Sequence, residues 1–328
     1  METKYGGLGS DFRLFSGRAN PELAAEVAAE LGVSLGQISI ETFPDSETYV
    51  KIEESVRGAD IYIIQPTCTP VNDNLMELLI MMDAFRRASV RQITAVVPYY
   101  GYSRQDRKAV GREPVSARLA ADLIVTAGAN RVVSVDLHAP QIQGFFTIPM
   151  DHLTAVFLFA EYFKGKDLSN AVIVSPDVGR AKLAEKYASL LNLPMVLMHK
   201  RRAGSCGNIV KVIEIVGDVE GKVPIVIDDM IASGSIINQV RLLCERGAEP
   251  AYLAITHPVL VGESLERMQD EAVRELVVTN TIPIPQWKRE KLGPKLKVLS
   301  IAPLIAKVIA KIHRHESVSE VFYHDVRG

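Results

Sequence analysis

Two adjacent carboxylates, Asp228 and Asp229, end the apolar stretch "VPIVIDD" (223–229). Small residues and then a helical pattern, "SIINQVRLLCERG" (235–247), follow them. A loop of small residues lets backbone N–H groups close on phosphate oxygens, and a helix N-terminus adds a favourable dipole. Carboxylates suit sugar hydroxyls instead, and they can contact Mg²⁺ directly or through water. The pattern predicts a sugar-phosphate site; the alternative is an ordinary turn with a solvated acidic pair. The small residues are Ala232, Ser233, Gly234 and Ser235.

Charged and polar residues also stand at the ends of four other apolar runs. Ligands of parallel sheets bind beyond the carboxyl ends of the strands, so these residues are expected to share a site. Taken singly, each has a simpler interpretation, because strands commonly end at the surface. Five such ends in one chain favour the functional interpretation. The residues are "GYSRQDRK" (101–108), Asp136 and His138, Asp177, and Lys200 to Arg202.

Short β-branched runs alternate with helical patterns along most of the chain. The runs are apolar at successive positions, as expected for strands covered by helices on both faces. In "NPELAAEVAAELG" (20–32), Asn20 is the expected N-cap, Pro21 the first helical residue and Gly32 the stop. This alternation predicts an α/β fold with mainly parallel sheets. The expected strands are 61–66, 93–100, 131–138, 171–177, 223–229 and 251–258.

Composition narrows the class of protein. The 328 residues carry 37 Lys and Arg against 39 Asp and Glu, which argues against nucleic-acid binding driven by bulk charge. Three widely spaced cysteines make a disulfide framework or a zinc module a poor expectation. We expect a cytoplasmic protein with no membrane partner. Because one open sheet rarely holds so many strands, we expect two domains, 1–150 and 151–311, with a tail of about 312–328 packed on the first.

Motifs spread over nearly the whole chain resemble ribose-phosphate pyrophosphokinase, the class I-like phosphoribosyl-pyrophosphate (PRPP) synthetases. The acidic pair and its loop resemble the phosphoribosyl-binding loop that these enzymes share with phosphoribosyltransferases. The other motifs occur in the family's order. They are "FPDSETYVKIEESVRG" (43–58), "PVNDNLMELLIMMDAFRRAS" (70–89), "VVPYYGYSRQDRK" (96–108), "DLHAPQIQGFF" (136–146), "SPDVG" (175–179), "HKRR" (199–202) and "SVSEVF" (317–322).

The resemblance implies two doubly wound domains of the phosphoribosyltransferase type and a defined reaction. The pyrophosphoryl group of ATP passes to O1 of ribose 5-phosphate, which gives PRPP and AMP. It also implies Mg²⁺ as cofactor, inorganic phosphate as activator and ADP as inhibitor. A segment around Phe43 that reaches a neighbouring subunit implies a homo-oligomer, expected as a hexamer built from dimers. No Walker A motif is present, so ATP is expected to be held in another way.

Roles for individual residues follow from the resemblance. Lys200 and Arg202 match a mobile catalytic loop, with "AGSCGN" (203–208) as its flexible continuation. Cations that close over phosphates suit a reaction that depends on positioning and charge stabilisation. The other matches are Phe43, Asp45, Glu47, Arg104, Gln105 and His138 for ATP, His138 and Asp177 for Mg²⁺, Asp228, Asp229 and 232–236 for ribose 5-phosphate, and Ser317, Ser319 and Phe322 for regulation.

The ribose-phosphate loop departs from the family's usual pattern. Aligned without a gap, Ala232 replaces an Asp and Ile236 replaces the closing Thr; a one-residue deletion would instead bring Ser235 opposite that Thr. Three hypotheses remain. The first is an active PRPP synthetase, which the ATP motifs favour. The second is a weak or inactive homologue with a regulatory or partner-binding role. The third is a phosphoribosyltransferase, which leaves the ATP motifs unexplained.

Overall fold

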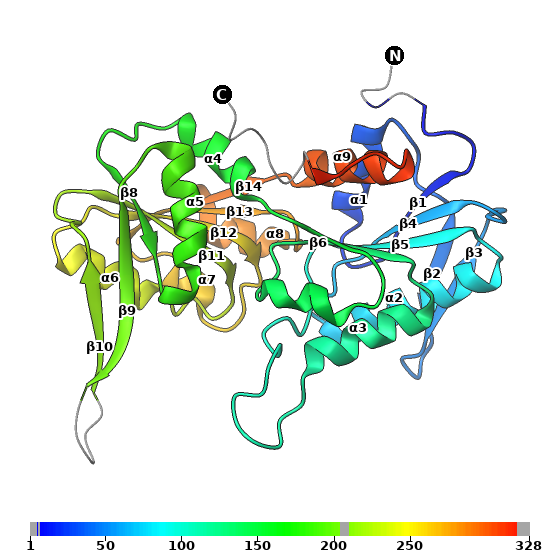
Figure 1. Ribbon diagram of the computed structural model, residues 1–328, viewed down its shortest axis with the longest axis horizontal. Helices are drawn as coiled ribbons and strands as arrows, with labels where there is room; N and C mark the ends of the chain where they lie inside the picture. Colours follow the sequence, from blue (N-terminus) through cyan, green and yellow to red (C-terminus); the bar gives the residue numbers. More distant parts are fainter. Residues whose placement is uncertain (1–4, 6, 204–209, 320–328) are drawn as a thin grey trace. The chain divides into compact units, whose positions relative to one another are not determined.

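The computed structural model describes residues 5, 7–203 and 210–319, and they form two compact units (Figure 1). Unit 1 holds the described residues up to Thr154, 281–283, and those from Ser300 onward. Unit 2 holds 155–280 and 284–299, apart from the undescribed residues. The domain limits predicted at 150 and 311 stay a prediction.

Unit 1 contains a five-stranded parallel sheet in the order β1-β4-β5-β6-β7. Its central strands are buried except at the first residues of β5 and β6, because helices cover both faces. Figure 1 shows α1 and α9 on one face, and α2 and α3 on the other. The elements are β1 (Phe12–Ser16), β4 (Asp60–Ile64), β5 (Gln92–Val97), β6 (Arg131–Val135), β7 (Met150–Leu153), α1 (Pro21–Leu31), α2 (Val71–Arg87), α3 (Ser116–Ala127) and α9 (Ala302–His313).

Helix α1 begins and ends where the sequence predicts. The Asn20 side chain accepts a hydrogen bond from the Leu23 N–H, and Pro21 is the first helical residue. Gly32 closes the helix at φ 69°, a left-handed conformation that is easily reached without a side chain. The local signals are therefore sufficient to define this helix.

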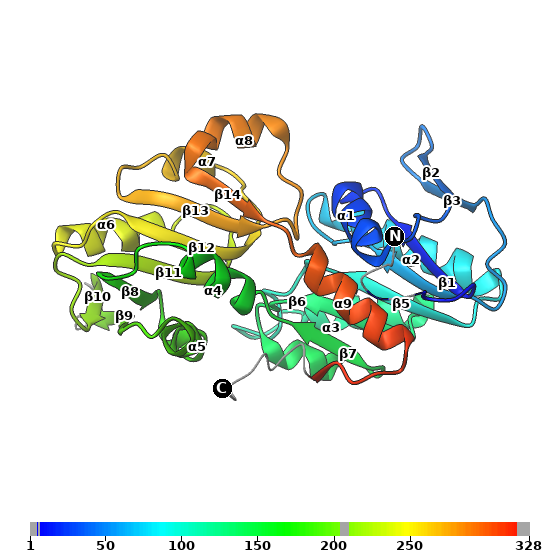
Figure 2. The same ribbon diagram turned by 90° about the horizontal axis from the view of Figure 1, so that it is seen from above.

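A separate antiparallel hairpin, β2 (Ile38–Thr42) and β3 (Thr48–Ile52), interrupts the parallel pattern of unit 1. Its partly buried side chains Ile38, Ile40, Val50 and Ile52 pack against the core that lies under α2 and α3. The tip between the strands carries the predicted nucleotide residues Phe43, Asp45 and Glu47. Figure 2 shows this hairpin standing clear of the five-stranded sheet.

A charged cluster attaches the C-terminal helix α9 to the first strands of the chain. Arg91 pairs with Asp60 (2.5 Å) and Asp11 (2.8 Å). His313 lies 3.4 Å from Asp60, and its Nε2 forms a hydrogen bond with the Leu8 carbonyl (2.6 Å). The guanidinium satisfies both carboxylates, so the cluster is a structural connection and not a free set of metal ligands.

Unit 2 contains a seven-stranded sheet in the order β10-β9-β8-β11-β12-β13-β14, parallel except for β10. The strand order reverses between β8 and β11, and such a switch point is where doubly wound sheets bind ligands. The elements are β8 (Ala171–Ser175), β9 (Met195–Ala203), β10 (Val210–Val216), β11 (Val223–Ile231), β12 (Ala251–Pro258), β13 (Val273–Thr279), β14 (Leu296–Leu299), α4 (Val156–Lys164), α5 (Ala181–Leu191), α6 (Ile237–Glu245), α7 (Ser264–Arg267) and α8 (Gln286–Leu292).

The prediction of an α/β fold with mainly parallel sheets is confirmed. In the described ranges, no helix combines the length and apolar character that crossing a bilayer requires.

Candidate functional site

The acidic pair of unit 2 lies at the switch point, on strand β11 beside β8. The strand continues to Ile231, so the prediction that it ends at Asp229 is wrong. Met230 and Ile231 extend the ladder by pairing with His257 and Pro258 of β12. The two carboxylates are therefore held on a rigid element, before the loop begins.

Arg180 contacts both members of the pair. Its Nε donates to the Asp228 carboxylate (3.1 Å), and its Nη2 donates to Asp229. Asp228 also accepts from the Asp229 N–H (2.8 Å). The Asp229 side chain is 3% exposed, and that of Arg180 is 15% exposed. The site is thus a largely buried group of two carboxylates and one guanidinium.

Burial raises the pKa of Asp228 well above its ordinary value, because it removes water from the charged form. Repulsion from Asp229 raises this pKa further, and the guanidinium of Arg180 opposes both effects. Without Arg180, two neighbouring carboxylates would have to share a site with little water. The ion pair is therefore what allows them to stay together.

The loop after β11 is held in place by its carbonyl groups. Val261 N–H donates to the Ala232 carbonyl (3.0 Å), and Arg267 donates to the Ser233 carbonyl (3.0 Å). Within the described chain, the N–H groups of 233–236 donate no hydrogen bond. These donors precede α6, whose dipole favours an anion at the same place. The loop can accordingly accept a phosphate through its backbone.

Two residues of the loop have a clear packing role. Gly234 has φ +74°, and a Cβ there would lie 3.1 Å from the Ser264 Cα. Ile236 is 8% exposed, and its side chain belongs to the apolar core of unit 2. Only the backbone of Ile236 is then available to a phosphate, and its buried side chain does not point into the loop's open side under either alignment.

Asp177 follows β8 and so lies at the same switch point as the acidic pair. Its carboxylate accepts from the Arg180 N–H (3.1 Å) and caps the short 3₁₀ turn Val178–Arg180. Gln239 of α6 donates to the Pro176 carbonyl (2.6 Å), which fixes this loop against the helix. The side chain of Asp177 is exposed and retains oxygen atoms that can bind a hard cation.

Lys200 and Arg202 lie within strand β9, and not in a loop beyond the strand as predicted. Lys200 pairs with Ile213 and Arg202 pairs with Lys211 in the antiparallel ladder with β10. The ladder provides hydrogen-bond partners that the sequence run alone does not reveal. The side chains of both residues, and most of the predicted flexible segment 203–208, fall outside the described residues.

Unit 1 places its predicted nucleotide residues after neighbouring strands. Arg104 and Gln105 follow β5, and His138 follows the adjacent β6. Arg104 is exposed, while the Gln105 side chain accepts from the Ser116 hydroxyl (2.6 Å). His138 is half-buried, and Asp136 before it has φ +34°. A positive φ at a strand end is a strained backbone that often marks a functional position.

The hairpin tip presents an exposed aromatic surface. Phe43 is 44% exposed, and its ring stacks on Tyr49 with centroids 5.5 Å apart. The Asp45 carboxylate accepts from the Glu47 N–H (3.2 Å) and closes the turn. Such a ring can stack on a planar base from another molecule.

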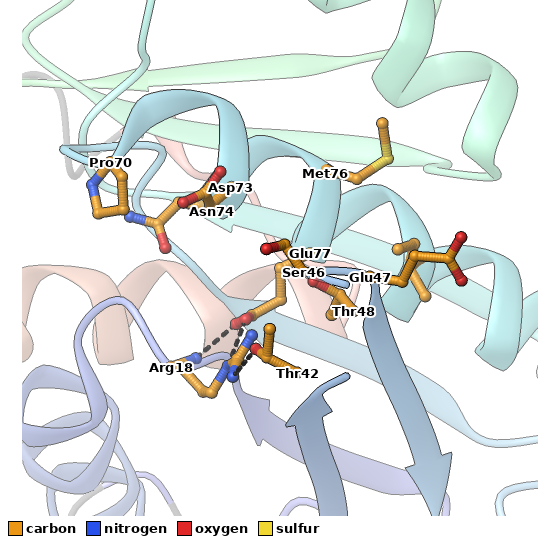
Figure 3. A pocket seen from close by; sticks show the side chains of 11 residues that line it. Arg18, Thr42, Ser46, Glu47, Thr48, Pro70, Asp73, Asn74, Met76 and Glu77 are labelled. Carbon is orange, nitrogen blue, oxygen red and sulfur yellow. Dashed lines mark hydrogen bonds and ion pairs between the residues drawn. The ribbon is translucent and has the colours of Figure 1, made fainter. Parts of the chain in front are cut away.

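A hollow of about 740 Å³ lies between this hairpin and α2. Arg18 pairs with the buried Glu77 (2.6 Å) and donates to the Thr42 hydroxyl (2.8 Å). Figure 3 shows Glu47 at the rim, with its carboxylate pointing away from Arg18. The hollow was not predicted, because residues far apart in the sequence line it.

Ser317 and Ser319 line a second hollow in unit 1, of about 400 Å³, together with Arg131. The Ser319 N–H donates to the Ser317 hydroxyl (3.2 Å). Phe322, the third predicted regulatory residue, lies outside the described residues.

The sequence did not predict a role for Arg180, which directly follows the motif "SPDVG" (175–179). Arg180 lies 48 positions from Asp228 in the sequence, so only the parallel pairing of β8 and β11 brings them together. A cation three residues after the strand-end carboxylate Asp177 was the available signal.

Two family models match the chain. Residues 12–128 match the N-terminal domain of ribose phosphate pyrophosphokinase, and 208–323 match the phosphoribosyl synthetase-associated domain. The chain is 50% identical over 323 residues to a ribose-phosphate pyrophosphokinase of Bacillus subtilis, covering 98% of this chain and 100% of that protein. A namesake from Oceanobacillus iheyensis is 48% identical over 314 residues, with 95% and 98% covered.

One solved structure is similar to this chain in both sequence and fold. It is the phosphoribosylpyrophosphate synthetase from Mycobacterium smegmatis, which is 46% identical to this chain with a TM-score of 0.87. The alignment covers 93% of this chain and 100% of that one. With its sheet reversal and acidic pair, and with relatives matched over nearly their full length, the chain belongs to the ribose-phosphate pyrophosphokinase family.

Proposed function

We propose that the protein transfers the pyrophosphoryl group of ATP to O1 of ribose 5-phosphate, giving 5-phosphoribosyl 1-pyrophosphate and AMP. The observation that carries this is about 50% identity to ribose-phosphate pyrophosphokinases along the whole chain. Neither the relatives named above nor the described residues favour a weak or inactive homologue. The transferase hypothesis would leave the matched N-terminal domain without a role.

The sugar is proposed to bind at the switch point of unit 2. Asp228 and Asp229 accept from the ribose hydroxyls, and the free N–H groups of 233–236 receive the 5-phosphate. Hydrogen bonds to a charged acceptor are among the stronger ones, which suits a loop made of backbone donors. The altered side chains of the loop are tolerated because these donors belong to the main chain.

The nucleotide is proposed to be bound by Arg104, Gln105 and His138, with Phe43, Asp45 and Glu47 holding the adenosine. The exposed Phe43 ring supports a base-stacking role. Because a hairpin tip that stands clear of its own sheet can reach another chain, we propose a homo-oligomer, with a hexamer built from dimers as its form.

Asp177 of unit 2 is proposed to bind Mg²⁺, which would neutralise phosphate charge during transfer, because its exposed carboxylate suits a hard cation. His138 of unit 1 is proposed separately as a Mg²⁺-linked residue. Lys200 and Arg202 then stabilise the charge that develops on the transferred group. Inorganic phosphate is proposed as an activator at Ser317, Ser319 and Phe322, where Arg131 supplies a nearby positive charge.

The assay that tests the activity contains purified protein, ATP, ribose 5-phosphate, Mg²⁺ and inorganic phosphate. We expect AMP and PRPP to form in equal amounts and in proportion to the protein. Binding of ATP without either product would contradict the proposal and support the inactive homologue.

The substitution Gly234→Ala tests the phosphate-binding loop. A side chain at φ +74° is strained by about 1–2 kcal/mol, and the new Cβ would press on Ser264. We expect the KM for ribose 5-phosphate to rise about tenfold, which corresponds to about 1.4 kcal/mol, while the KM for ATP changes little. Gly262→Ala is the matched control, because a Cβ there, also at positive φ, meets no atom within 4 Å. Equal effects of both substitutions would remove Gly234 from the sugar site.

A further inference from the structure

Arg180 occupies the side of the acidic pair where a metal ion would otherwise be expected. Its guanidinium reaches both carboxylates at once, through Nε to Asp228 (3.1 Å) and through Nη2 to Asp229. All three side chains are largely withdrawn from water, with exposed fractions of 15% for Arg180, 26% for Asp228 and 3% for Asp229.

Arg180 is held in position both at its backbone and at its guanidinium. At the backbone, its N–H donates to the Asp177 carboxylate (3.1 Å) as part of a capped turn. That turn is itself held by Gln239, which is 5% exposed and donates to the Pro176 carbonyl (2.6 Å). A guanidinium anchored in this way is a permanent part of the site.

The charges and donors of this group do not fit a divalent cation. An ion that bridged Asp228 and Asp229 would lie beside a fixed positive charge in surroundings with little water to screen it. It would also compete with Arg180 for carboxylate oxygens that already accept hydrogen bonds. Asp177 differs, because it is exposed and, among the described residues, its carboxylate meets just the uncharged backbone donor of Arg180.

We propose that Arg180 is a fixed cation that takes the place of a metal ion at the acidic pair. Asp228 and Asp229 then bind sugar hydroxyls through lone pairs that the guanidinium leaves available, and they bind no Mg²⁺. Arg180 is a positioning residue, since it acts through the two carboxylates. The identity of the sugar rests on the proposed function; the exclusion of a metal ion does not.

The test counts the metal ions bound by the full-length protein. Mn²⁺ is titrated in the absence of nucleotide and sugar, and the free ion is measured by its electron paramagnetic resonance signal. Mn²⁺ shares the preference of Mg²⁺ for oxygen ligands. We expect Arg180→Gln to bind one more Mn²⁺ per chain than the unmodified protein, because it frees the pair from its positive charge. Arg180→Lys keeps that charge and is expected to match the unmodified protein.

Two controls assign the additional ion. Arg241→Gln removes a more exposed guanidinium of the same unit, which pairs with the single carboxylate of Asp270 (2.5 Å), and is expected to add no Mn²⁺. Combining Arg180→Gln with Asp229→Asn should abolish the additional ion. A folded Arg180→Gln protein with an unchanged count would overturn the proposal.

A variant that keeps Arg180 tests whether the acidic pair binds a metal ion even if Arg180→Gln does not fold. Asp229→Asn alone is expected to leave the Mn²⁺ count unchanged, because the pair holds no ion when Arg180 is present. Loss of one Mn²⁺ would show that the pair is a metal site and would refute the proposal. The Mn²⁺ titrations are carried out without substrate, so their result can be interpreted whether or not AMP and PRPP form in the activity assay.

Discussion

Lys200→Ala is expected to lower kcat about 1,000-fold, which corresponds to a loss of about 4 kcal/mol of transition-state stabilisation. Removing a single preorganised donor from a site of developing charge typically costs 100- to 1,000-fold, and loss of a positioned cation in phosphoryl transfer can cost more. Since this stabilisation acts in the transition state, the KM for ATP should change little. Steady-state kinetics with both substrates varied measures the two quantities separately.

Lys222→Ala is the matched control for that experiment. Lys222 lies just before β11, at the opposite end of the strand from the acidic pair, and donates to the Asn170 side chain (3.1 Å). We expect its loss to leave kcat within a factor of two. An unchanged kcat in Lys200→Ala would remove Lys200 from the mechanism and leave Arg202 as the candidate cation of β9.

Glu77→Ala is expected to destabilise unit 1 by about 3 kcal/mol. The Glu77 side chain is 2% exposed and accepts from three donors: the Arg18 N–H (2.7 Å), the Arg18 Nε (2.6 Å) and the Gln65 amide (2.9 Å). Without the carboxylate, the buried Gln65 amide loses a partner, and unsatisfied buried groups are costly. The half-exposed guanidinium of Arg18 can return to water, so the loss falls at the lower end of the range for buried pairs.

Hydrogen exchange followed by mass spectrometry can detect this loss in unit 1 alone. A loss of 3 kcal/mol should speed exchange of the slowest amides in α2 and β4 about 100-fold. The single tryptophan, Trp287 of α8, reports on unit 2, and its fluorescence transition in urea should not move. Glu41→Ala removes an exposed carboxylate from β2 and should change stability by less than about 0.5 kcal/mol. Equal exchange rates in both variants would refute the role assigned to Glu77.

Parallel strands with helical crossovers were predictable because their signals are local. The run 171–177 predicted β8, and the caps Asn20 and Gly32 predicted α1. The proximity of Asp177 to the acidic pair was predictable too, because neighbouring parallel strands bring their carboxyl ends to one edge of the sheet. The family resemblance supplied the reaction, which no local pattern contains.

The parts that were missed depend on partners distant in the sequence. The β2–β3 hairpin is partly buried and alternates in polarity, so it lacks the apolar run that marks a strand covered on both faces. The charged run 200–202 suggested a strand end, but antiparallel pairing with β10 extends the strand through it. Arg180 reaches Asp228 and Asp229 through a side chain, and no spacing in the sequence reveals such a contact.

The attachment of α9 to the first strands has a consequence for synthesis of the chain. Helix α9 packs on α1 and is fixed by the cluster of Arg91, Asp60 and His313, yet it is made more than 200 residues after the strands that it covers. During translation, β1, β4 and β5 emerge early, and the face that α9 will share is covered only by α1 while all of unit 2 is made. The unit that starts first is therefore the last to be finished, and the nascent chain exposes part of its apolar sheet surface until α9 has been made.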